Sequence, residues 1–221
     1  MSTYVKRGEP LEFDNAPDWL VGYMQYRRTI LNATPTSVMT YFKDLRGFFQ
    51  WVSFYMNTGR HPKNAEALHS ISILDFSLKK AASLKKSDIE THLYFLADVL
   101  GNGPVTRNKK LVVIRSFYDY LLDQQETLGI SLQANPAARI KRPKEPKKQP
   151  IFLPEEDQYA LLEAIQGENG VRDYAITLLG LSSGLRISEI VALDIADLDL
   201  QNEQLRIRNG KGGKDRTAYL T

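Results

Sequence analysis

Two short segments in the second half of the sequence constrain its fold more than any others. The first reads Ser183-Gly-Leu-Arg186 within an apolar, helix-like region. Gly184 permits a left-handed turn that ends one helix, so Arg186 falls at the start of the next. The second is Asn209-Gly-Lys-Gly-Gly-Lys-Asp-Arg216, a glycine-rich turn between two strand-like runs. The chain is therefore predicted to form two consecutive helices and then a β-hairpin.

Each segment presents one cation that suits phosphate chemistry. Arg186 lies where backbone N–H groups favour an anion, and a guanidinium binds phosphate as a planar fork. Glu189, three residues on, shares a helix face with Arg186 and can orient its guanidinium. Lys211 lies in the turn and can give up a proton. Singly, such residues are usually ordinary surface groups, but together they indicate phosphoryl transfer on a nucleic-acid backbone.

The first ~140 residues are predicted to be helical. Helix starts are expected at Asn15–Asp18, Thr34–Pro35, Ser87–Glu90 and Thr106. A short extra helix is expected near 75–82, and the second part adds helices over about 153–166, 172–182 and 186–193. Strands are expected over 204–208 and 217–220. The predicted fold class is mainly α with a small β-hairpin.

Composition excludes several classes of protein. The sequence has no cysteine, so it forms neither a disulfide framework nor a thiolate metal site. No apolar run approaches the ~18 residues that a membrane span requires, and the start of the chain lacks the apolar core of a signal peptide. The histidines, His61, His69 and His92, are scattered and are expected to be structural or exposed. A cytoplasmic protein without metal or membrane is predicted.

Positive charge is concentrated in one proline-rich segment. Between Arg139 and Lys148 there are six basic residues and one acidic residue, which makes this segment net +5 in a chain of net +3. One interpretation is a solvated linker between domains, and the other is a linker that crosses a DNA backbone. The sequence leaves both open.

Taken together, the two C-terminal segments resemble the catalytic domain of the tyrosine recombinase (phage integrase) family, especially its Xer-like bacterial members. The first half resembles the family's helical core-binding domain, through Ser37-x-x-x-Tyr41-x-x-Asp44-Leu45 and Asn108-Lys-Lys-Leu111. The resemblance implies a core-binding, DNA-binding domain over 1–138, a basic linker over 139–152, and the N-terminal part of a mixed α+β catalytic domain over 153–221.

The resemblance also implies a reaction, site-specific DNA recombination through a 3′-phosphotyrosyl intermediate. Arg186 would contact the scissile phosphate, Lys211 would protonate the leaving 5′-oxygen, and Glu189 would support them. No ATP, cofactor or metal is implied. The remaining catalytic motifs and the nucleophilic tyrosine of the family would lie beyond Thr221, and Tyr219 does not occupy the nucleophile's place. The chain is therefore expected to be a fragment that is inactive by itself.

The implied partners are double-stranded DNA and further recombinase protomers in a synaptic tetramer. Candidate DNA contacts, chosen by position, are Lys43, Arg46, Lys109, Lys110, Arg115, Arg139, Lys141 and Arg142. Two alternatives remain. One is a non-catalytic protein that occupies recombination sites, and the other is a helical protein-interaction module with an incidental basic segment.

Overall fold

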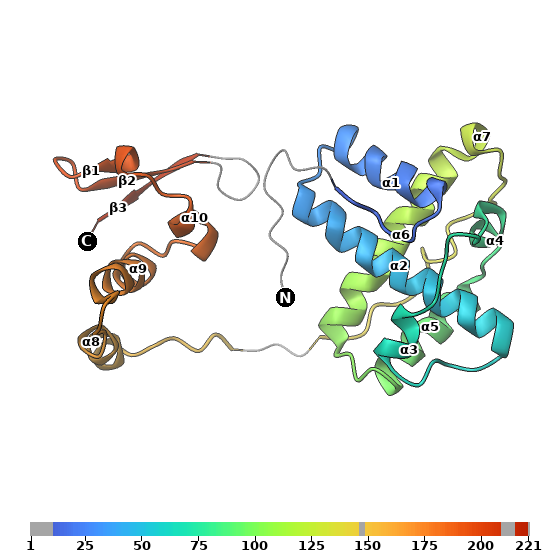
Figure 1. Ribbon diagram of the computed structural model, residues 1–221, viewed down its shortest axis with the longest axis horizontal. Coiled ribbons are helices and arrows are strands. Elements are labelled where there is room, and N and C mark those ends of the chain that lie inside the picture. Colours follow the sequence, from blue (N-terminus) through green and yellow to red (C-terminus); the bar gives the residue numbers. More distant parts are fainter. Residues whose placement is uncertain (1–10, 146–148, 209–214, 221) are drawn as a thin grey trace. The chain divides into compact units, whose positions relative to one another are not determined.

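The computed structural model describes residues 11–145, 149–208 and 215–220. The chain divides into two units, Met1–Lys147 and Lys148–Thr221 (Figure 1). The first is helical, and the second combines helices with a small antiparallel sheet, so the predicted fold class is confirmed. Among the described residues, no helix has the length and apolar character needed to cross a bilayer.

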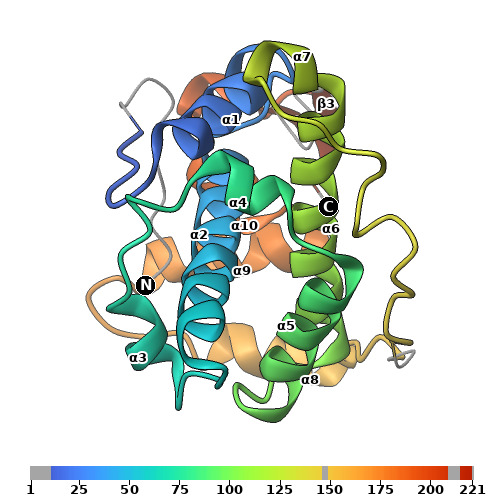
Figure 2. The ribbon, with the colours of Figure 1, turned by 90° about the vertical axis from the view of Figure 1, so that its right-hand side faces the viewer.

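The first unit is built from seven described helices. They are α1 (Asp18–Thr29), α2 (Pro35–Thr58), α3 (Ala65–His69), α4 (Leu78–Ala82), α5 (Lys86–Asp98), α6 (Pro104–Asp123) and α7 (Gln125–Leu128). The longest, α2, packs against α1, α3, α5 and α6, and Figure 2 shows it running through this unit.

Local sequence explains where these helices begin. The Thr34 hydroxyl accepts the backbone N–H of Ser37, and Pro35 takes the first position of α2, as predicted. Two predicted starts were wrong. Helix α5 begins at Lys86, ahead of Ser87, because the Asp88 carboxylate accepts the Lys85 N–H at 2.7 Å. Helix α6 begins at Pro104, which suits a first position, so Thr106 lies inside it.

An aromatic core holds the first unit together. Trp51, Phe49 and Phe117 are almost completely buried, and the Phe49 and Phe117 rings meet edge to face with centroids 5.5 Å apart. His92 is buried beside Trp51, and burial lowers its pKa to about 3, so the ring is neutral near pH 7. His61 accepts the Trp51 indole N–H at 3.2 Å.

The start of the predicted linker is packed against the first unit. Ala137 and Ile140 are buried in the helical core. The Arg115 guanidinium donates to the Ala137 and Ile140 carbonyls at 3.1–3.2 Å. Asn108, also on α6, donates to the Pro143 carbonyl at 3.0 Å. The residues from 139 to 145 therefore belong structurally to the first unit, and the division between units falls after them.

The second unit comprises three described helices, a 3₁₀ turn and three strands. These are α8 (Glu155–Glu163), α9 (Gly170–Ser182), α10 (Ile187–Val191), η1 (Ile195–Asp197), β1 (Leu198–Asp199), β2 (Gln204–Ile207) and β3 (Arg216–Tyr219). The strands pair antiparallel in the order β1-β2-β3. Strand β1 was not predicted, because two residues are too few to show the alternation of a strand.

Strand alternation separates the two faces of this sheet. Leu205, Ile207 and Ala218 are buried with Leu185, whereas Arg206 and Thr217, which pair across β2 and β3, are exposed. The small core thus connects the turn before Arg186 to the hairpin.

Candidate active site

The backbone delivers Arg186 through the predicted glycine turn. Helix α9 ends at Ser182, and Gly184 has a φ of 58°, in the left-handed region. Leu185 is buried, and Arg186 follows in extended backbone as the N-cap of α10. The helix is shorter than predicted, five residues from Ile187 to Val191.

The anion that occupies this helix start is the carboxylate of Glu189. Its Oε2 accepts the Arg186 backbone N–H at 2.9 Å, and its Oε1 accepts the Arg186 Nη1 at 2.8 Å. The predicted proximity of Glu189 and Arg186 is therefore present, as an ion pair with a buried carboxylate. The Arg186 side chain stays 57% exposed, so a ligand can still reach its guanidinium.

A second arginine, which sequence reasoning missed, binds the same carboxylate. Arg216, the first residue of β3, donates through Nη2 to Glu189 Oε2 at 2.8 Å. Arg216 is the last residue of the glycine-rich segment. Its positive charge at that position is the sequence feature that could have identified it as a site residue. Because Arg216 is 27 residues from Glu189, helical spacing could not reveal the pair.

These contacts set the protonation state of Glu189. Its pKa is lowered to about 2, first by the Arg186 backbone N–H and then by hydrogen bonds from the Arg186 and Arg216 side chains, against the opposing effect of burial. The carboxylate is therefore ionised throughout the physiological range. The cluster of Arg186, Glu189 and Arg216 carries two cations and one anion.

A pH prediction follows from the lowered pKa. A carboxyl group whose pKa falls from 4.5 to about 2 on folding stabilises the fold above pH 4.5, and this contribution is lost as pH falls from 4.5 through 2. We expect Glu189→Gln to destabilise the second unit near pH 7, and its difference from wild type to shrink below pH 4.5. Amide hydrogen exchange at Leu205 and Ala218 measures this. A difference that is constant between pH 7 and 3 would contradict it.

Lys211 lies outside the described residues. The strands that flank its turn are described, and Ile207 pairs with Arg216 at the end of the ladder next to the turn. Through Arg216, this end of the hairpin is bonded to Glu189 on α10.

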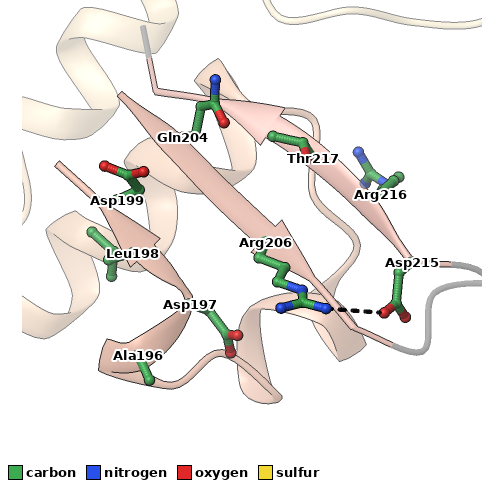
Figure 3. A pocket seen from close by; sticks show the side chains of 9 residues that line it. All are labelled: Ala196, Asp197, Leu198, Asp199, Gln204, Arg206, Asp215, Arg216 and Thr217. Carbon is green, nitrogen blue, oxygen red and sulfur yellow. Dashed lines mark ion pairs between the residues drawn. The ribbon is translucent and has the colours of Figure 1, made fainter. Parts of the chain in front are cut away.

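The sheet also carries a hollow of about 390 Å³, drawn in Figure 3. Arg206 and Asp215 form a long ion pair of 4.0 Å there, and the Arg208 guanidinium pairs with the buried Asp197 carboxylate at 2.5 Å. Within the described part of the chain, no group of three or more acidic or histidine side chains is arranged to hold a metal ion.

The candidate DNA contacts have different surroundings. Exposed side chains belong to Lys43, Lys109, Arg139, Lys141 and Arg142, and Arg46 is half-buried. Lys110 is paired with Asp44 at 2.5 Å between α6 and α2. Arg115 donates to the carbonyls of residues 137 and 140, and its contact with DNA stays a prediction.

Comparison with known proteins finds relatives of this chain in one family. The model of the phage integrase family matches residues 152–221. The tyrosine recombinase XerC of Caldanaerobacter subterraneus subsp. tengcongensis is 32% identical over 98% of this chain and 59% of its own length. XerC of Pelobacter propionicus is 33% identical over 86% of this chain and 54% of its own length. The chain thus spans little more than half the length of these relatives.

A solved structure shows a similar fold. The Tn1549 transposon integrase, in a variant bound to transposon right end DNA, matches with a TM-score of 0.50 and 20% identity. The match covers 79% of this chain and 61% of that integrase. With the sequence matches and the arginine–glutamate cluster, the chain belongs to the tyrosine recombinase (phage integrase) family and is similar to its Xer-like members.

Proposed function

We propose that this chain is part of a site-specific DNA recombinase, which breaks and rejoins DNA through a 3′-phosphotyrosyl intermediate. The observation that carries the proposal is the exposed Arg186 guanidinium, held by the buried Glu189 carboxylate beside the strand that follows the Lys211 turn. The whole protein that contains this chain is called the whole recombinase below. The family relationship supports the same activity.

In the proposed reaction, a tyrosine oxygen attacks the scissile phosphate, and the bond from phosphorus to the 5′-oxygen breaks. Arg186 stabilises the negative charge that develops on the non-bridging oxygens. Lys211 donates its proton to the departing 5′-oxygen as a general acid. The phosphotyrosyl bond conserves the energy of the broken phosphodiester, so rejoining needs no ATP.

The proposed partners are duplex DNA and further protomers in a synaptic tetramer, and the proposed location is the cytoplasm, where bacterial DNA lies. Support for a DNA partner comes from the exposed cations on α2, on α6 and along residues 139–142. The Tn1549 transposon integrase was solved in complex with transposon right end DNA, which supports the same partner. Neither the exposed cations nor the fold distinguishes a protein that cuts DNA from one that only binds it. The experiment must therefore detect the cut.

The test is a suicide substrate, a nicked duplex that traps the covalent intermediate. We expect the whole recombinase to give a slowly migrating, protease-sensitive DNA band after denaturing electrophoresis. Specific binding with no such band would favour the alternative of a protein that occupies sites without cutting. No binding even at low salt would favour the interaction module.

We also expect the 221-residue chain by itself to give no adduct. Tyr219 lies in β3 opposite Gln204, and its carbonyl accepts the Ser183 hydroxyl at 3.0 Å, so it is a strand residue of the sheet. The same trapping assay measures this, with Tyr219→Phe as the control. An adduct that disappears in Tyr219→Phe would show that this tyrosine is the nucleophile.

A further inference from the structure

We infer that Arg216 is a positioning residue of the recombination site, which holds Arg186 in place through the Glu189 carboxylate that the two arginines share. The inference rests on the proposed function and extends it to a residue on a different element. Arg216 enters from β3, whereas Arg186 and Glu189 belong to the start of α10. The juxtaposition is two guanidinium groups on the two oxygens of one buried carboxylate.

Arg216 fixes the orientation of the Glu189 carboxylate. Glu189 and Arg186 are three residues apart, and both side chains are carried by the same short helix. Within this turn, Arg186 alone supplies two hydrogen bonds to the carboxylate, from its backbone N–H to Oε2 and from Nη1 to Oε1. Arg216 adds a third hydrogen bond, to Oε2, from a strand that is fixed by its pairing with β2. The oxygen that accepts Arg186 Nη1 is thereby fixed as well.

Arg216 also changes the net charge of the site. With Arg216 present, the three charged groups sum to +1, which favours binding of an anionic phosphate. Without it, Glu189 would neutralise Arg186 one to one. Removal of Arg216 therefore weakens both the orientation of Arg186 and the attraction of the site for phosphate.

Arg216 is not part of the apolar core of the second unit. The Arg216 side chain is 40% exposed, whereas the core behind the sheet consists of Leu185, Leu205, Ile207 and Ala218. Truncation of Arg216 leaves these apolar contacts intact. Loss of activity without unfolding is therefore the expected result.

Arg206 provides a matched control. It lies on the neighbouring strand β2, as Figure 3 shows, and pairs with Thr217 in the ladder. Its side chain is 69% exposed and forms a 4.0 Å ion pair with Asp215. Arg206→Ala thus removes an arginine of the same hairpin without touching Glu189.

The kinetic test is single-turnover cleavage by the whole recombinase. Arg216→Ala should slow cleavage by on the order of 10²-fold, the effect of a small misplacement of a catalytic group. Arg216→Lys should recover part of this rate, and Arg206→Ala should cleave like wild type. In a Glu189→Gln background, Arg216→Ala should slow cleavage little further, because the ion pair between Arg216 and the Glu189 carboxylate is already broken. Full additivity of the two substitutions would overturn the inference.

A second measurement works on the 221-residue chain without activity. The carboxyl carbon of Glu189 is followed by NMR as pH is lowered. In Arg216→Ala the pKa of Glu189 should rise from about 2 toward its ordinary value, and in Arg206→Ala it should not move. An unchanged titration in Arg216→Ala would overturn the inference. Failure of wild type to cleave would instead overturn the proposed function, so the two failures are distinguishable.

Discussion

In the whole recombinase, Lys211→Ala is expected to cleave ordinary DNA roughly 10²–10⁴-fold more slowly than wild type, the loss typical of a missing general acid. The same variant should recover most of its rate on DNA with sulfur in place of the 5′-bridging oxygen. A thiolate is a much weaker base than an alkoxide, so it departs without a donated proton. Single-turnover cleavage of the two substrates measures the effect.

Arg186→Ala should behave differently on the same two substrates. Its guanidinium stabilises charge on the non-bridging oxygens, which the sulfur substitution leaves in place. We expect a loss of about 10²–10³-fold, comparable to the loss of an oxyanion-hole donor, on both substrates. The geometry of Arg186 supports its role in stabilising charge on the phosphate. Glu189 orients its guanidinium, while more than half of the Arg186 side chain stays exposed.

Lys214→Ala is the matched control, since it removes a second lysine from the same glycine-rich segment. It should cleave ordinary DNA much faster than Lys211→Ala. Equal rescue of Lys211→Ala and Arg186→Ala by sulfur, or rescue of neither, would contradict the proposed division of labour. Both lysines lie outside the described residues, so this prediction rests on the sequence and on the flanking strands.

Sequence patterns located the elements whose signals are local. Thr34-Pro35 predicted the start of α2 because a cap and a proline act within one turn. Where two local signals compete, the prediction failed. At α5, the sequence predicts Ser87 as the cap, yet the Asp88 carboxylate accepts the Lys85 N–H and the helix starts earlier. Helix α3 was not predicted, because its five residues are too few to show the helical repeat of apolar side chains.

Long-range contacts could not be predicted from the sequence, for a different reason. The segment from 139 to 145 reads as a linker, because its basic and proline residues show no apolar periodicity. Its order comes from Arg115 and Asn108 on α6, which bind its carbonyls. The same limit applied to the site. Glu189 was found by its helical spacing from Arg186, but Arg216 reaches it only because the strands fold back.

The binding of duplex DNA by the 221-residue chain should depend steeply on salt. Lys110 is ion-paired with Asp44 and Arg115 is bonded to backbone carbonyls, so we count the other six candidate cations, whose side chains are exposed or, in Arg46, half-buried. If each neutralises one phosphate, log affinity should fall with log salt with a slope of about −5, and affinity should drop ~10³-fold between 50 and 200 mM salt. Fluorescence anisotropy with a labelled duplex, across several salt concentrations, measures the slope.

The basic segment can be tested separately, because its cations project from a backbone that is fixed to α6. Combined replacement of Arg139, Lys141 and Arg142 by alanine should make the slope shallower by about 3 units, since each lost phosphate contact removes about 0.9. The control removes equal charge from the same unit, at the exposed lysines 79, 85 and 86, and should keep the wild-type slope. If both triple variants change the slope equally, only total charge matters and the segment makes no specific contact.

A fixed segment on the helical unit, in contrast to a freely moving linker, loses little conformational entropy when it contacts phosphates. Its three cations should therefore contribute more to affinity than the control lysines.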